Sequence, residues 1–191
     1  MASVVETERT SEAPGAPLSI GAVLFLASDL LLFAGFFAAY FTIGAASDEW
    51  PPAGVEIDSA RPLIFTVVLV ASALTVWRGV VAARAGRRSE AQAWLIATGV
   101  SGLAFIGGTL LEFADLSFDI DTDAYGSVYW ITFGVHLLHV AAGLFLIGVV
   151  VALLRGKSRA PADVIVTVLA YFWYFLAGLS VALFLVFYVI Q

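Results

Sequence analysis

The sequence predicts an all-α protein, a polytopic bundle of five transmembrane helices. Of its 191 residues, 61% are hydrophobic and only 13% are charged, about half the charged fraction of an ordinary soluble domain. The apolar residues also form five continuous stretches, each long enough for a transmembrane helix of about 20 residues. A β-barrel would instead show alternating segments of about ten residues.

The five stretches place the helices near residues 19–45, 63–83, 91–114, 127–154 and 164–190. Each stretch is bounded by charged residues, proline or glycine. We therefore expect residues 18–191 to form a single five-helix transmembrane domain. Residues 1–17 are polar and lack the basic start and apolar core of a signal peptide, so we expect a disordered cytoplasmic tail.

The basic residues predict how the bundle is oriented. The loops after the first and third helices contain only Arg61 between them. The other loops and the helix ends beside them are basic, with Arg78, Arg84, Arg87, Arg88, Arg155, Lys157 and Arg159. Because loops rich in lysine and arginine remain in the cytoplasm, we expect the N-terminus to be cytoplasmic and the C-terminus to be outside.

In the helix at 19–45, the residues divide into two faces at helical spacing. Small residues form one stripe, with Ala27, Ala34 and Ala38. Asp29 lies on the opposite side, together with the bulky Phe36 and Tyr40. This face resembles the wall of a groove more than a close contact between helices. The small stripe is the expected packing face.

In the helix at 91–114, small residues recur at steps of about four and end at an acid. Such stripes let transmembrane helices approach closely, so we predict a packing face with Glu112 buried at its end. The stripe consists of Ala93, Ala97, Ser101, Ala104 and Gly108.

In the helix at 127–154, one face carries polar side chains, which should point inward because polar groups facing lipid are costly. It consists of Tyr129, Thr132, His136, His139 and Gly143. By helical rise, Asp29 and His139 both lie near the middle of the bilayer. Either histidine could therefore pair with Asp29, although the faces alone do not bring the two helices together.

Two interpretations of Asp29 remain open at this point. An acid at mid-membrane indicates a functional site, and the alternative is a protonated acid bonded to a neighbouring helix. His136 and His139 could bind a metal in principle. With no cysteine and only two histidines in the chain, we instead expect packed, hydrogen-bonded side chains and no metal site. No nucleic-acid partner is expected.

The aromatic run at 171–175 includes Trp173 and Tyr174. Core packing and contact with a lipid, quinone or partner are both compatible with it. Together with Phe36 and Tyr40, these residues are our candidates for contact with lipid or a partner.

Three blocks of sequence are similar to subunit III of the haem-copper terminal oxidases, the cytochrome c oxidase subunit 3 family, in its five-helix prokaryotic form. The first is "ASDLLLFAGFFAAYF" followed by "EWPP". The second is "LLEF", whose acid is Glu112. The third, "YGSVYWITFGVHLLHVAAGLFLI" (125–147), resembles the family's Gly-x-His-x-x-His-Val helix. The resemblance covers the chain from about residue 19 onward.

The chain departs from the family pattern at several positions. Asp29 stands where the family has glutamate, and Thr109 where it has glutamine. In the last helix, Tyr174, Ala177 and Ser180 replace a histidine, an aspartate and a tryptophan. These changes leave open which oxidase the chain joins.

The resemblance implies a subunit with no redox centre of its own, packed against oxidase subunit I and near subunit II in the plasma membrane of a prokaryote. Haems and copper would lie in those partners. The family's subunit III encloses a lipid-holding cleft, supports proton uptake into subunit I and protects its active site during turnover. Asp29 corresponds to the cleft's carbodiimide-reactive acid, and bound phospholipid is expected.

Three alternatives follow from the departures and the buried acid. The chain could serve a quinol oxidase or a nitric oxide reductase, or act in assembly. It could also be an independent transporter or channel that uses Asp29 and the histidines. Against the last, the sequence shows neither the inverted repeat nor the paired broken helices typical of transporters.

Overall fold

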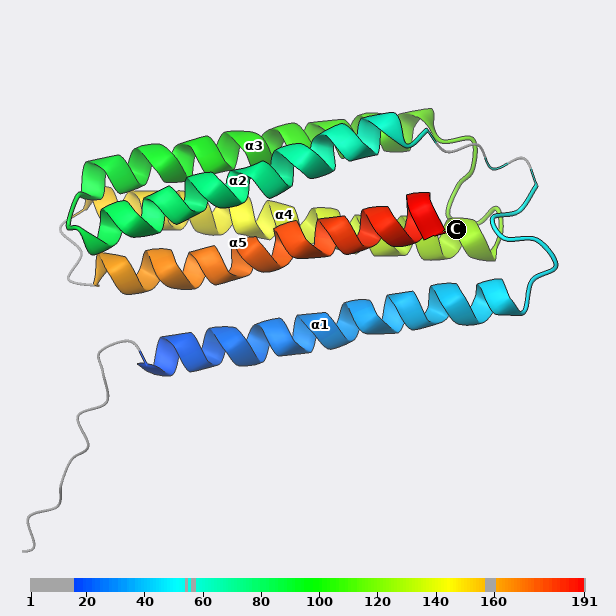
Figure 1. The fold of residues 1–191 in the computed structure, drawn as a ribbon, viewed down its shortest axis with the longest axis horizontal. Helices are drawn as coiled ribbons and strands as arrows, with labels where there is room; N and C mark the ends of the chain where they lie inside the picture. Colours follow the sequence, from blue (N-terminus) through cyan, green and yellow to red (C-terminus); the bar gives the residue numbers. More distant parts are fainter. Residues whose placement is uncertain (1–15, 54, 56–57, 157–160, 191) are drawn as a thin grey trace, which may run out of the picture.

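The computed structural model describes residues 16–53, 55, 58–156 and 161–190 and shows five long helices (Figure 1). They are α1 (Ala16–Ala45), α2 (Ala60–Arg84), α3 (Arg88–Asp115), α4 (Ala124–Arg155) and α5 (Ala162–Phe184), and a π-helix, η1 (Leu185–Ile190), continues α5. All five are long and apolar enough to cross a membrane. The predicted all-α, five-helix class is therefore confirmed.

The helix boundaries differ from the predicted ranges by a few residues. The helix α1 begins at Ala16 and α2 at Ala60, each three residues before the predicted start. At the start of α4, the carboxylate of Asp123 accepts a hydrogen bond from the Gly126 amide, 2.7 Å away, which caps the helix. The predicted tail lies outside the described residues except for its last two, which begin α1.

Four of the helices form a closed ring in which α2 packs on α3, α3 on α4, α4 on α5 and α5 on α2. The helix α1 lies outside this ring, against α4 and α5 (Figure 1). A tight turn at Gly86, with a φ of 74°, joins α2 to α3. Glycine suits this left-handed conformation because it has no Cβ.

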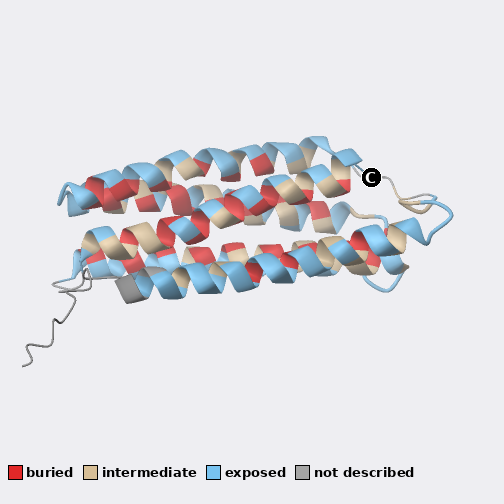
Figure 2. Cartoon of the chain, turned by 60° about the horizontal axis from the view of Figure 1, so that its bottom comes forward, coloured by how far each residue is buried: buried red, intermediate tan, exposed pale blue. Residues whose placement is uncertain are grey.

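The core has two parts along the helix axes. One part is mainly aliphatic and centres on Trp173 of α5, whose side chain is 0% exposed. The ring fits there because α3 and α4 have glycine beside it, at Gly102 and Gly143. The other part is aromatic and is built around Phe33, Tyr125, Tyr129 and Phe187. Most other large apolar side chains are exposed (Figure 2), as lipid contact requires.

The predicted packing stripe of α3 is partly wrong. Ala93 and Ala104 are exposed, while Gly108 and Glu112 are buried. The stripe drifts around the helix because most of its steps are four residues long, which is more than one helical turn of 3.6 residues. The buried face instead follows mixed steps of three and four and consists of Ala91, Leu95, Thr98, Gly99, Gly102, Phe105, Gly108 and Glu112.

The prediction for α1 is also corrected. Its small residues Ala27, Ala34 and Ala38 are all exposed, and the helix packs through the bulky side that bears Asp29. Large side chains on this side reach across to α4 and α5, where Phe33 is fully buried. The small stripe therefore faces away from the rest of the chain.

Candidate functional site

The acid of α1 and the second histidine of α4 lie together near the middle of their helices. One carboxylate oxygen of Asp29, Oδ1, is 3.5 Å from Nε2 of His139. The other ring nitrogen, Nδ1, lies 2.7 Å from the Val135 carbonyl oxygen. Since a carbonyl only accepts, Nδ1 carries a proton and donates it there, which leaves Nε2 facing Asp29. The pair that depth alone made possible is therefore present in the structure.

Aromatic rings surround this pair. The Phe33 ring meets the His139 ring edge-on, with 5.5 Å between the centroids, and Phe172 of α5 lies 6.5 Å from the same ring. The second carboxylate oxygen of Asp29 is buried and has no hydrogen-bond partner among the described residues. Asp29 thus sits in a largely apolar setting with His139 as its ionisable neighbour.

An apolar groove of about 510 Å³ lies between α1, α4 and α5. On α1 it is bordered by Ala22, Phe25 and Leu26, and Asp29 follows on the same side of the helix. The remaining walls carry aliphatic and aromatic side chains, including Leu146, Val150, Ile165 and Phe172. The groove is lined almost entirely by hydrocarbon, which suits an acyl chain.

The two histidines of α4 point to different places. His139 faces α1, whereas His136 points into the four-helix ring, where it is 1% exposed and its ring lies 5.5 Å from that of Phe105 on α3. Neither nitrogen of His136, nor the buried hydroxyl of Thr132, has a hydrogen-bond partner within the described parts of the chain. The described part of the chain contains no group of three or more histidine, aspartate or glutamate side chains placed to hold a metal ion.

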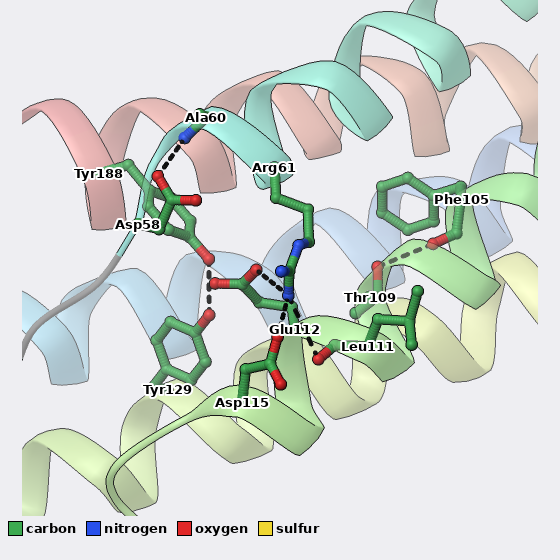
Figure 3. A network of polar contacts seen from close by, with 10 residues as sticks. All are labelled: Asp58, Ala60, Arg61, Phe105, Thr109, Leu111, Glu112, Asp115, Tyr129 and Tyr188. Atoms are coloured by element: carbon green, nitrogen blue, oxygen red, sulfur yellow. Dashed lines mark hydrogen bonds and ion pairs between the residues drawn. The ribbon is translucent and has the colours of Figure 1, made fainter.

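Glu112 belongs to a charged network where α2 begins and α3 ends, next to the α1–α2 loop (Figure 3). Arg61 at the start of α2 lies 3.8 Å from the Glu112 carboxylate and forms a close ion pair with Asp115. The Arg61 side chain is 39% exposed and that of Glu112 only 10%. Arg61 therefore balances a largely buried acid from the surface.

A small chamber of about 30 Å³ lies inside the ring of α2–α5, and Glu112 forms part of its wall. Beside it, the hydroxyls of Tyr129 on α4 and Tyr188 on η1 are 2.5 Å apart, and those of Thr66 and Ser180 are 3.4 Å apart. Its polar lining consists of Thr66, Thr109, Glu112, Tyr129, His136, Ser180 and Tyr188. Of the predicted polar residues, Glu112, Tyr129 and His136 thus meet around one cavity, whereas Thr132 and His139 do not line it.

Two of the four predicted contact residues are corrected. Tyr40 is 1% exposed and Trp173 is fully buried, so both belong to the chain's own core and cannot face lipid or a partner. Tyr40 packs on Phe187 with 4.5 Å between ring centroids. Phe36 is half-buried and Tyr174 is 37% exposed, so these two keep a surface for contact.

Sequence reasoning missed the roles of Arg61, Thr66 and Tyr188. Each is a polar side chain at or inside an apolar stretch, and this position was the feature of the sequence that could have identified it as a candidate. Their meeting with Glu112 and His136 depends on the pairing of α2 and α5 with α3 and α4, which helical periodicity does not reveal.

Comparison with known proteins gives a consistent result. Residues 7–191 match the family described as "Cytochrome c oxidase subunit III". The probable cytochrome c oxidase subunit 3 of Mycobacterium tuberculosis (strain ATCC 25618 / H37Rv) is 37% identical over 181 residues, covering 91% of this chain and 88% of the relative. The cytochrome c oxidase subunit 3 of Thermostichus vulcanus is 30% identical over 173 residues, covering 90% and 86%.

These matches extend over nearly the whole chain and include all five helices. Members of this family have no catalytic centre of their own and carry no haem or copper. Other oxidase subunits must therefore be present for the complex to function. The chain belongs to the cytochrome c oxidase subunit III family, in its five-helix prokaryotic form, and is a multi-pass membrane subunit of that oxidase.

Proposed function

We propose that this subunit packs on the haem-copper subunit I and near subunit II in a prokaryotic plasma membrane, with its N-terminus in the cytoplasm. In that position it supports proton uptake into subunit I and prolongs the working life of the oxidase. The observation that carries this proposal is the Asp29–His139 pair, 3.5 Å apart near the middle of the bundle and beside an apolar groove.

The pair is suited to a proton-linked role because carboxyl and imidazole groups can both exchange protons, and here one lies 3.5 Å from the other. A buried carboxylate with one unpaired oxygen is costly unless a partner compensates it. Oδ2 of Asp29 is buried and has no hydrogen-bond partner among the described residues, so it is available for a further hydrogen bond. The proposed role of this chain is therefore linked to protons and does not include a catalytic step.

The groove supports the lipid part of the proposal. A phospholipid acyl chain laid against Phe25, Leu146 and Phe172 would cover side chains that otherwise border an open space. It would also keep water away from the Asp29 side of α1. A lipid bound in this groove would thus help to maintain the apolar surroundings of Asp29.

The basic residues support the proposed orientation. Arg84, Arg87 and Arg88 lie at the α2–α3 turn and Arg155 at the end of α4, the end of the bundle where α1 begins (Figure 1). Under the positive-inside rule this end is cytoplasmic.

The test is Asp29→Asn in the assembled oxidase. We expect the initial rate of oxygen reduction to stay near that of the wild type, because electron transfer occurs in other subunits, and activity to decay faster during continuous turnover. Ser28→Ala is the matched control, since Ser28 is exposed and its hydroxyl donates to the Leu24 carbonyl of the same helix. Equal rates of inactivation in Asp29→Asn and the wild type would remove Asp29 from this role.

A further inference from the structure

We propose that the chamber inside the α2–α5 ring is a water-binding site, and that its water joins His136 to Glu112. The proposal concerns the inward side of α4 and is separate from the groove and the Asp29–His139 pair. It begins from His136, which is 1% exposed and has no protein partner for either ring nitrogen in the described structure.

A buried imidazole requires partners. In the neutral ring one nitrogen donates a hydrogen bond and the other accepts one. Leaving a buried polar group unpaired costs free energy, and most such groups bond to protein or to ordered water. Since no described residue forms a hydrogen bond with His136, water is the small ligand that satisfies both a donor and an acceptor.

The chamber has the size and the walls that water needs. Its volume of about 30 Å³ has room for about two water molecules, since one needs on the order of 10–15 Å³ of such space. A buried water also needs two to four polar partners. Here the hydroxyls of Thr66, Ser180, Tyr129 and Tyr188 and the carboxylate of Glu112 surround the space that His136 faces.

Glu112 provides the connection to the end of the bundle. It lines the chamber and also lines a hollow of about 290 Å³ formed with Asp58, Arg61 and Asp115. Glu112 thus borders both the chamber and the hollow of the surface network, whose charged side chains are drawn in Figure 3. Water reaches His136 by passing Glu112, with the Tyr129 and Tyr188 hydroxyls beside the path.

Hydroxyl-radical footprinting of the assembled oxidase, read by mass spectrometry, tests the proposal because radicals formed from bound water mark the side chains next to it. We expect His136 to be marked in the wild type. In Ser180→Val, whose added methyl groups fill the chamber, marking of His136 should fall several-fold. His139, on the α1 side, should be unchanged.

Ser101→Val is the matched control, because Ser101 lies on α3 outside the chamber and its hydroxyl donates to the Ala97 carbonyl of the same helix. Its marking pattern should equal that of the wild type. An unmarked His136 in the wild type, or equal marking in Ser180→Val, would overturn the proposal.

A second measurement does not depend on the folding of any variant. A density map of the wild-type oxidase that resolves water should show a water molecule about 2.7–3.2 Å from a nitrogen of His136. An empty chamber, or a protein group bonded to both nitrogens, would refute the site. Neither result depends on the inactivation rate of Asp29→Asn.

Discussion

Trp173 of α5 donates a hydrogen bond to Ser72 of α2, with 2.8 Å between the indole nitrogen and the serine oxygen. Both side chains are buried. This bond ties α5 to α2 in the aliphatic part of the core, where the indole ring also meets α3 and α4.

We expect Ser72→Ala to lower the free energy of unfolding by about 1 kcal/mol, because it leaves the buried indole N–H without its acceptor. Unfolding by SDS in mixed micelles measures this. Ser101→Ala removes a hydroxyl that donates to the Ala97 carbonyl of its own helix and should change the free energy of unfolding by less than about 0.5 kcal/mol. Equal losses in both variants would contradict a special role for the Trp173 bond.

Gly102→Ala should destabilise the bundle by about 2 kcal/mol, a typical cost of overpacking. A Cβ at Gly102 would lie 2.7 Å from the Trp173 ring and 2.9 Å from Leu144. Gly107→Ala on the same helix meets nothing within 4 Å and should be neutral or slightly stabilising, since alanine favours helices. The same micelle titration compares the two, and a similar effect of both changes would refute the argument.

Arg61→Gln should lower the free energy of unfolding only modestly, because Arg61 is partly exposed and solvent screens its charge. The loss arises because Glu112 stays largely buried without its cation. Adding Glu112→Gln removes the buried acid, so the double variant should regain most of the lost stability. Thermal unfolding of the two single variants and the double variant checks this, and additive losses would mean that the two side chains act independently.

His139→Gln should shorten the working life of the oxidase about as much as Asp29→Asn, because each change removes one member of the same pair. For residues that act as a unit, effects are not additive. The double variant should therefore inactivate no faster than either single variant. Inactivation during continuous turnover is the measurement, and a faster loss in the double variant would separate their roles.

Ala22→Phe should reduce the lipid that co-purifies with the oxidase, since the added ring fills the groove bordered by Ala22. Ala27→Phe makes the same change on the exposed side of α1 and serves as the control. Native mass spectrometry counts the lipids that remain bound. Unchanged lipid in Ala22→Phe would argue against the groove as their site.

The sequence was sufficient for the number of helices, because long apolar stretches reflect the thickness of the bilayer. It was also sufficient for the inward face of α4, where Thr132 and His136 are buried. The packing faces of α1 and α3 were harder to predict. In a membrane, small residues permit close contact but do not require it, so exposed Ala27 and buried Gly108 look alike in the sequence.

The individual residues of the candidate site could be predicted from the sequence, but which of them lie together could not. Asp29, Glu112 and the histidines stand out as polar residues in apolar helices. His139 faces Asp29 on α1, whereas His136 lines the chamber, and this difference depends on which helices pack against α4. The burial of Tyr40 and Trp173 could not be predicted either, because aromatic residues suit lipid-facing, partner-facing and core positions equally well.

The position of α1 outside the ring has a consequence for synthesis. The helix made first packs against the two made last, so α1 must wait in the bilayer until α4 and α5 have been inserted. During that interval Asp29 has no His139 beside it. A ribosome that stalls before α4 would leave an unmatched acid facing lipid, a feature by which quality-control proteases could distinguish an incomplete chain from a finished one.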